Sequence, residues 1–236
     1  SVGIAMLASD GPGFDDLLRA AHAALRAARE LGRNTVQLHN EEIRRHTRRR
    51  LEIEHALRGA LEREEFSLVY QPQIAIRDDH PPGIEALVRW QHPGLGACHP
   101  GEFVPIAEHC GEIVRLGEWV IAEACRQAVA WHAAGLEFGR IAINVSGVQL
   151  RDRGFAERVV SLCQRAGWPP SRLELELTES ALILDSDNLR HCFQVFERHG
   201  VQLAVDDFGT GFSNLHYLNR FPVQRLKIDR SFVVDM

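Results

Sequence analysis

Acidic and amide side chains stand in or at the end of several apolar segments of the sequence. Asp206 and Asp207 are adjacent at the end of "QLAV", Glu176 lies in "RLELELT", Glu85 in "GIEALVRW" and Asn144 in "RIAINVS". Gathering these carboxylates in one place without a partner would carry a large cost in charge repulsion and desolvation. A bound cation removes that cost, so the pattern indicates a metal site.

The donor atoms suit a hard divalent cation. Carboxylate oxygens and the amide oxygen of Asn144 favour Mg²⁺ or Mn²⁺, and the sequence has no CxxC pair or HExxH spacing for a softer metal. Two cations about 3.5–4 Å apart hydrolyse phosphodiesters in many enzymes, and Asp206 or Asp207 would bridge them. Arg89 would then grip a phosphate oxygen, while Lys227 would orient the attacking water or neutralise developing charge.

Several of these residues also fit ordinary structural roles. An aspartate after a strand often caps the next helix, which would explain Asp206 and Asp207. Glu174 and Glu176 alternate along one segment and would then form a solvated strand face, and Lys227 would form a surface ion pair. The structural explanation requires several separate strands to end in polar residues by coincidence, so we favour the metal site.

The elements that must position these residues are strands alternating with helices. Strand-like runs are "FSLVYQPQIAI", "GIEALVRW", "RIAINVS", "RLELELT", "QLAVDDF" and "RLKID", and helical periodicity covers about 113–134, 155–166 and 188–199. Apolar strands that alternate with helices are typical of a parallel sheet covered on both sides. A doubly wound sheet and a (β/α) barrel both fit, and in a barrel the carboxyl ends of the strands form the active-site face.

The first 64 residues have a different organisation. Residues 1–40 predict strand, helix and strand, which together bury too little surface to fold alone. Residues 41–64 predict a linker helix that carries the basic cluster "RRHTRRR". This cluster is either a nucleic-acid arm or, as the flanking glutamates favour, a solvated helix face.

Composition limits the classes of partner. The net charge is −5 with a pI near 6.2, which argues against binding polymeric nucleic acid through bulk charge. The sequence has no apolar run of the roughly 18 residues that would indicate a membrane span. Its five cysteines are widely spaced, so a reducing cytoplasm is the expected compartment.

Residues from about Phe66 to the end resemble the EAL domain, a family of cyclic di-GMP phosphodiesterases. The motifs "EALVRW", "INVSGVQL", "LELTES", "VDDFGTGFSNLHYL" and "LKIDRSFV" match that family in order and spacing. The resemblance implies a TIM-like α/β barrel with an antiparallel first strand. It also implies hydrolysis of cyclic di-GMP to linear pGpG in bacterial second-messenger signalling, with two Mg²⁺ or Mn²⁺ ions and inhibition by Ca²⁺. The alternative is an EAL domain without catalysis that acts as a cyclic di-GMP receptor.

The resemblance also implies roles for individual residues. The metal ligands would be Glu85, Asn144, Glu176, Asp206 and Asp207, with Glu85, Asp206 and Lys227 taking part in catalysis. Lys227 would assist the water, while Arg89 and Gln71 would contact the substrate. Glu179 would hold the loop from Asp207 to Asn214, which in the family couples dimerisation to metal binding, so a homodimer is expected.

The two ends of the chain carry further expectations. Residues 1–40 resemble the C-terminal tail of a GGDEF domain, residues 41–64 a linker helix and residues 65–236 an EAL domain. The family continues for two strands beyond the "LKID" segment, with another metal-associated glutamate. The resemblance therefore implies a C-terminally truncated barrel within a longer tandem GGDEF–EAL protein. Its GGDEF and sensor domains would lie upstream, where a membrane anchor would also fall.

Overall fold

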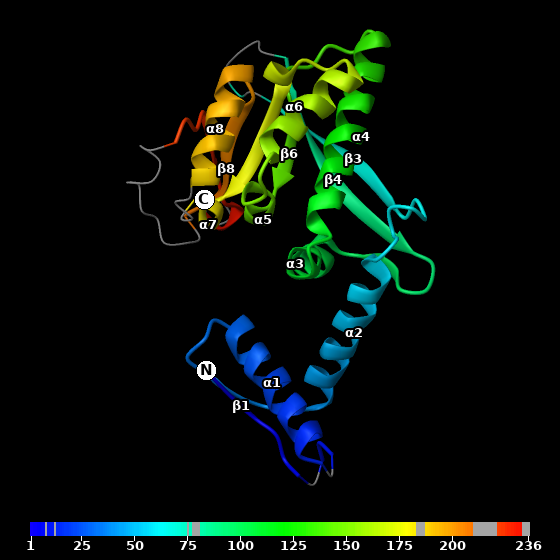
Figure 1. The fold of residues 1–236 in the computed structure, drawn as a ribbon, viewed down its shortest axis with the longest axis vertical. Coiled ribbons are helices and arrows are strands. Elements are labelled where there is room, and N and C mark those ends of the chain that lie inside the picture. Colours follow the sequence, from blue (N-terminus) through cyan, green and yellow to red (C-terminus); the bar gives the residue numbers. More distant parts are fainter. Residues whose placement is uncertain are drawn as a thin grey trace. The chain divides into compact units, whose positions relative to one another are not determined.

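The chain divides into two compact units. The structure, a computed structural model, describes residues 1–7, 9–11, 13–74, 76, 81–182, 187–209 and 221–232 (Figure 1). One unit comprises Ser1–Arg58 and the other Gly59–Met236. None of the helices in the described ranges is long and apolar enough to cross a lipid bilayer.

The first unit opens with a strand–helix–strand element, as predicted. Strand β1 (Val2–Ile4) pairs in parallel with β2 (Val36–Leu38), and α1 (Phe14–Glu30) connects them. The residues that α1 buries are spaced four apart, so they share one helix face; they are Ala20, Ala24 and Ala28.

Helix α2 (Glu41–Leu57) carries the basic cluster, of which Arg44, Arg45, His46 and Arg48 are exposed and Arg49 and Arg50 are half-buried. Arg44 Nη1 lies 3.1 Å from Glu41 Oε2, and Arg48 Nε donates to Glu52 Oε1 at 3.1 Å. These arginines are therefore paired with acids of the same helix, which favours the solvated helix face.

One mixed sheet forms the centre of the second unit. Its strand order is β3-β4-β6-β7-β8-β9, with the short β5 also paired to β4. The strands are β3 (Phe66–Gln73), β4 (Gly83–His92), β5 (Gly96–Cys98), β6 (Ile141–Val145), β7 (Leu173–Thr178), β8 (Gln202–Phe208) and β9 (Arg225–Ile228). β3 is antiparallel to β4, whereas β4, β6, β7, β8 and β9 are mutually parallel, which confirms the predicted antiparallel first strand.

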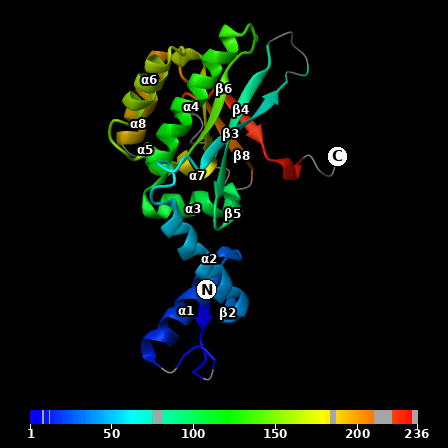
Figure 2. The ribbon, with the colours of Figure 1, turned by 90° about the vertical axis from the view of Figure 1, so that its right-hand side faces the viewer.

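Three long helices cover one side of this sheet. They are α4 (Ile113–Ala133), α6 (Phe155–Ala166) and α8 (Asp187–His199), and both views place them on the same side of the strands (Figures 1 and 2). The shorter helices are α3 (Pro100–Cys110), α5 (Gly147–Leu150), α7 (Glu179–Leu182) and the 3₁₀ turns Pro170–Arg172 and Arg230–Phe232. Burial of both faces of β6 explains its near-continuous apolar sequence, whereas β7, also buried, alternates leucine with glutamate.

The sheet is curved enough for side chains of its first and last strands to meet. Arg225 Nη1 on β9 donates to Gln73 Oε1 on β3 at 3.0 Å, although the two strands stand at opposite ends of the strand order. The described residues contain no backbone pairing between β3 and β9. A curved parallel sheet with helices outside and polar side chains inside is the architecture of a TIM-like barrel.

Candidate active site

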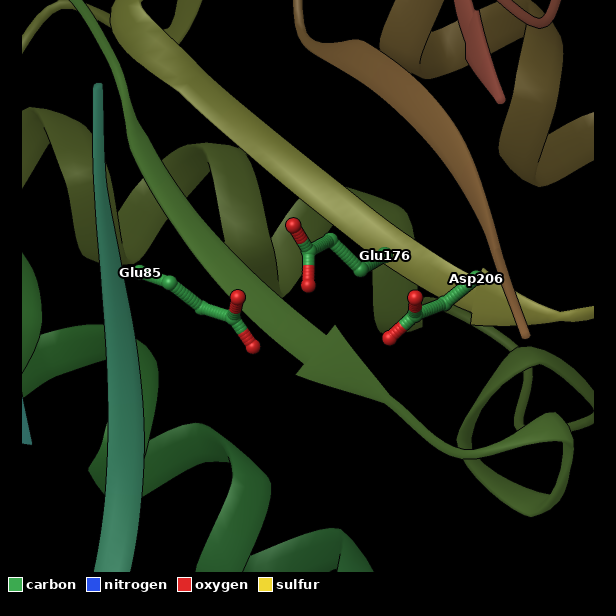
Figure 3. Close-up of side chains that lie close together, drawn as sticks. All are labelled: Glu85, Glu176 and Asp206. Carbon is green, nitrogen blue, oxygen red and sulfur yellow. The ribbon is translucent and has the colours of Figure 1, made fainter. Parts of the chain in front are cut away.

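Three carboxylates from three strands converge inside the curved sheet. They belong to Glu85 on β4, Glu176 on β7 and Asp206 on β8, and one oxygen of each lies within 4.8 Å of the others (Figure 3). In the parallel register Asn144 on β6 lies opposite Glu176 on β7. Asp206 on β8 lies opposite Thr178, two positions along β7 from Glu176, so Glu176 and Asp206 face the same side of the sheet. The predicted convergence of polar strand residues is therefore present in the fold.

Lys227 supplies positive charge to this cluster from β9. Its Nζ donates to Glu176 Oε2 at 2.6 Å, to Glu85 Oε2 at 3.1 Å and to Asp206 Oδ2 at 3.2 Å. The Glu176 side chain is 0% exposed and the Lys227 side chain is 23% exposed, so these charges interact with little screening by water. Lys227 is also the only lysine in the sequence, which sets it apart from the many arginines.

Asn144 binds the cluster from the neighbouring strand β6. Its Nδ2 donates to Glu85 Oε1 at 2.9 Å. The backbone just beyond it is held by Ser146, which caps α5 by accepting a hydrogen bond from Val148 N at 3.1 Å. Ser146 Oγ also donates to Glu108 Oε1 on α3 at 2.5 Å, so two further elements fix the end of β6.

A backbone irregularity occurs at the two adjacent aspartates. Neighbours in a regular strand point to opposite faces. The β8–β9 register shifts between Val205 and Phe208, an interval that contains both acids, and Asp207 adopts φ +53°. Asp206 joins the carboxylate cluster, whereas burial and the charges of Asp206 and Asp229 raise the pKa of Asp207.

Burial and pairing act in opposite directions on the titration of the cluster. Burial raises the pKa of Glu176 to about 7, although Lys227 acts to lower it. Burial would lower the pKa of Lys227, but the hydrogen bond to Glu176 and the surrounding carboxylates outweigh burial and raise it. Burial would raise the pKa of Glu85, yet Lys227 and Asn144 together lower it. The three close contacts of Lys227 with these carboxylates keep its ammonium group charged.

The donor set fits a hard divalent cation. Glu85, Glu176 and Asp206 offer carboxylate oxygens within reach of one another, and Asn144 lies beside Glu85 with an amide oxygen of its own. Oxygen donors of this kind are the ligands that Mg²⁺ and Mn²⁺ prefer.

A pocket of about 270 Å³ adjoins the cluster. Its walls include Asn144 and Glu176 from the cluster and Arg89 from β4. Arg89 is exposed and donates one hydrogen bond, to the Val88 carbonyl at 2.8 Å. A guanidinium group has five N–H donors, so Arg89 can also bind an anion in this pocket.

Gln71 and Glu179 occupy different surroundings from the cluster. Gln71 is exposed and pairs with Glu85 in the β3–β4 register. Glu179 begins α7, and both of its carboxylate oxygens are buried with no hydrogen-bond partner among the residues that the structure describes. The loop expected to contact Glu179, residues 207–214, is described as far as Gly209, which adopts φ +100°, and its remaining residues lie outside the described ranges.

Three residues that hydrogen-bond with one another or with the carboxylate cluster were not predicted as site residues from the sequence. They are Gln73, Glu174 and Arg225, and each lies two positions from a predicted site residue on the same strand. Residues two apart in a strand face the same side, so this spacing was the available signal. The Glu174 side chain is 2% exposed and that of Glu176 is 0% exposed, so these glutamates do not form a solvated strand face.

Comparisons with known proteins agree with this fold and site. Residues 54–236 match the EAL domain, and the chain belongs to the EAL domain family. The bifunctional diguanylate cyclase/cyclic di-GMP phosphodiesterase MucR of Pseudomonas aeruginosa is 39% identical over 236 residues, which cover 100% of this chain and 34% of MucR. The cyclic di-GMP phosphodiesterase NbdA of the same organism is 38% identical over 100% of this chain and 30% of NbdA.

A solved structure is similar as well. The structure of the P. aeruginosa MucR phosphodiesterase in complex with c-di-GMP superposes with a TM-score of 0.71 at 43% identity, covering 77% of this chain and 74% of that chain. This chain spans about a third of the length of the two curated relatives.

Proposed function

We propose that this chain is the phosphodiesterase part of a signalling protein that hydrolyses cyclic di-GMP to linear pGpG. The observation that carries the proposal is the convergence of Glu85, Glu176 and Asp206 beside a pocket lined by Arg89. The names of MucR and NbdA support the substrate, as does the cyclic di-GMP complex of MucR.

The described residues would divide the work as follows. Glu85, Asn144, Glu176 and Asp206 hold Mg²⁺ or Mn²⁺, with Asp207 as a further ligand where two ions bind. When bound, the cations supply an activated water and neutralise charge on the phosphate. Calcium, which favours larger and more irregular coordination, would occupy the site without supporting turnover.

Two basic side chains and one amide would handle the substrate. Arg89 binds a phosphate oxygen from the adjoining pocket, and Gln71 contacts the dinucleotide. Lys227, kept protonated by the surrounding carboxylates, offsets negative charge as water adds to phosphorus and the 3′ oxygen leaves. The leaving oxygen takes up a proton, and the product is pGpG.

Hydrolysis of cyclic di-GMP with Mg²⁺ by the natural gene product containing residues 1–236 tests this proposal. Asp206→Asn removes one carboxylate charge at nearly constant shape, so we expect turnover to fall by at least about 100-fold, as when a metal centre loses its transition-state stabilisation. The far-UV circular dichroism spectrum should stay unchanged. Wild-type turnover by Asp206→Asn would refute the assignment. Tight binding of cyclic di-GMP without hydrolysis by the wild type would indicate a receptor instead.

The first unit and the Glu179 loop add two subsidiary proposals. Residues 1–40 would be the C-terminal tail of a GGDEF domain, and residues 41–64 the linker to an EAL domain at 65–236. The name of MucR, a bifunctional diguanylate cyclase/phosphodiesterase that aligns with the whole chain, supports the presence of both kinds of domain in the full protein. Glu179 would hold the loop after Asp207 and link it to a homodimer interface. Its buried, unpartnered carboxylate within the described structure supports that role, because such a group needs a partner.

A further inference from the structure

Gln73, the last residue of β3, contacts two members of the carboxylate cluster. Its Nε2 donates to Glu85 Oε2 at 3.4 Å and to Glu176 Oε1 at 3.2 Å. Lys227 is the other described residue that hydrogen-bonds both carboxylates. Gln73 carries no charge, so it can order the two carboxylates without neutralising them.

Arg225 determines which way the Gln73 amide points. Arg225 Nη1 donates to Gln73 Oε1 at 3.0 Å. Because a guanidinium group only donates, the amide oxygen must face Arg225 and the amide nitrogen must face the carboxylates. A reversed amide would place its oxygen against Glu85 and Glu176 and its NH₂ group against the guanidinium, so the partners themselves assign the orientation.

Glu174 anchors Arg225 in turn. Arg225 Nη1 also donates to Glu174 Oε1 at 3.0 Å. The Glu174 side chain is 2% exposed, and a carboxylate so deeply buried requires a charged or hydrogen-bonding partner. Glu174 lies two residues before Glu176 on β7, so one strand face carries both the anchor and the carboxylate that Gln73 contacts.

Gly83 leaves room for this arrangement. It stands directly opposite Gln73 in the β3–β4 register. A Cβ atom at position 83 would lie 3.1 Å from Gln73 Oε1 and 3.5 Å from Gln73 Cβ. A side chain at this position would press on the amide, so glycine is suited to the place where the Gln73 side chain crosses.

We infer that Gln73 is a positioning residue of the cation site. Held by Arg225 and Glu174, its amide fixes the orientation of Glu85 and Glu176 toward each other, and so sets the affinity for a divalent cation. The inference rests on the metal-dependent phosphodiesterase proposed above. Hydrogen bonds that orient metal ligands typically change metal affinity or activity by 10–100-fold.

The affinity for Mn²⁺, measured by electron paramagnetic resonance without substrate, tests the inference in the natural gene product. Gln73→Met keeps the length of the side chain but removes its hydrogen bonds, and we expect it to raise the Kd for Mn²⁺ at least about tenfold. Gln164→Met is the matched control, because Gln164 is exposed on α6. This control should bind Mn²⁺ as the wild type does.

Arg225→Met tests the same chain of contacts from its other end. It leaves the Gln73 amide in place but removes the group that orients it, so the Kd for Mn²⁺ should rise here too. Because the two residues act through one hydrogen bond, the double variant Gln73→Met/Arg225→Met should lose less affinity than the sum of the single changes in binding free energy. Where Gln73→Met fails to fold, the Kd of Arg225→Met alone still tests the inference.

The outcomes separate this inference from the proposed function. Unchanged Mn²⁺ affinity in Gln73→Met or Arg225→Met, strictly additive effects in the double variant, or no Mn²⁺ binding by the wild type would overturn the inference. A wild type that binds Mn²⁺ but leaves cyclic di-GMP intact would refute the proposed function alone. The positioning role of Gln73 would still be decided by the Mn²⁺ affinities.

Discussion

Replacing Lys227 by methionine should destabilise the second unit in the absence of divalent cations. The change keeps the length of the side chain but removes the ammonium group that contacts Glu85, Glu176 and Asp206 at 3.1, 2.6 and 3.2 Å. The three carboxylates, which have side-chain exposures of 14%, 0% and 22%, would be left close together without their cation. We therefore expect the free energy of unfolding of Lys227→Met to be lower than that of the wild type.

The magnitude follows from the burial of this ion cluster. Removing one partner of a buried ion pair costs about 3–5 kcal/mol, because the remaining charge stays buried and uncompensated. For a domain of this size each kcal/mol lowers the melting temperature by about 2–4 °C, so Lys227→Met should melt about 6–20 °C below the wild type in EDTA. A cation present at 100 times its Kd adds about 2.7 kcal/mol of stability to the protein that binds it. Because the cation would replace the missing ammonium charge, Mg²⁺ should stabilise Lys227→Met more than the wild type and narrow the difference between their melting temperatures.

Urea and thermal unfolding, each with EDTA and with Mg²⁺, measure both effects in the natural gene product. Arg126→Met is the control, since Arg126 is 62% exposed and pairs with Glu123 at the surface, where ion pairs contribute about 0–1 kcal/mol. A Lys227→Met protein as stable as the wild type in EDTA would refute the electrostatic reasoning. A stability gap that Mg²⁺ leaves unchanged would refute the idea that ammonium and metal ion neutralise the same carboxylates.

Two further predictions concern Lys227 and Glu65. Acetic anhydride should modify Lys227 much more slowly than it modifies an exposed lysine, because the Lys227 ammonium group is largely buried and its pKa is raised. Peptide mass spectrometry of the treated, folded protein measures this rate. Rapid acetylation of Lys227 would contradict the contacts assigned to it. Glu65→Gln should cost about 1.5–3 kcal/mol in urea unfolding, because the carboxylate accepts hydrogen bonds from Trp90 Nε1 at 2.9 Å and Arg63 Nε at 2.5 Å. Burial would raise the pKa of Glu65, but these two partners lower it below its ordinary 4.5. The stabilisation is thus present above about pH 4.5 and disappears as the pH falls through the lower folded-state pKa, so equal acid sensitivity in wild type and Glu65→Gln would show the interpretation to be wrong.

The sequence alone determined the regular elements and the identity of the clustered carboxylates. The predicted helices at about 113–134, 155–166 and 188–199 are observed as Ile113–Ala133, Phe155–Ala166 and Asp187–His199. Local periodicity reports which face of each helix is buried, so these segments needed no tertiary information. Helix α3 was not predicted, because Pro100, Gly101 and Pro105 weaken the helical signal in its sequence.

The alternation of strands with helices also predicted that polar strand residues would meet. Consecutive parallel strands separated by helices bring equivalent positions to the same end of a sheet, which placed Glu85, Asn144, Glu176 and Asp206 together. This much follows from one strand–helix unit repeated along the chain.

Tertiary structure alone decided how those side chains contact one another. Asp206 joins the cluster, whereas Asp207, which has φ +53° in the irregular part of β8, has different neighbours, although the two are adjacent in sequence. Curvature of the sheet brings Arg225 to Gln73 across the full strand order. Periodicity describes the surroundings of one segment at a time, whereas these contacts depend on the backbone register and curvature that packing of the whole sheet establishes.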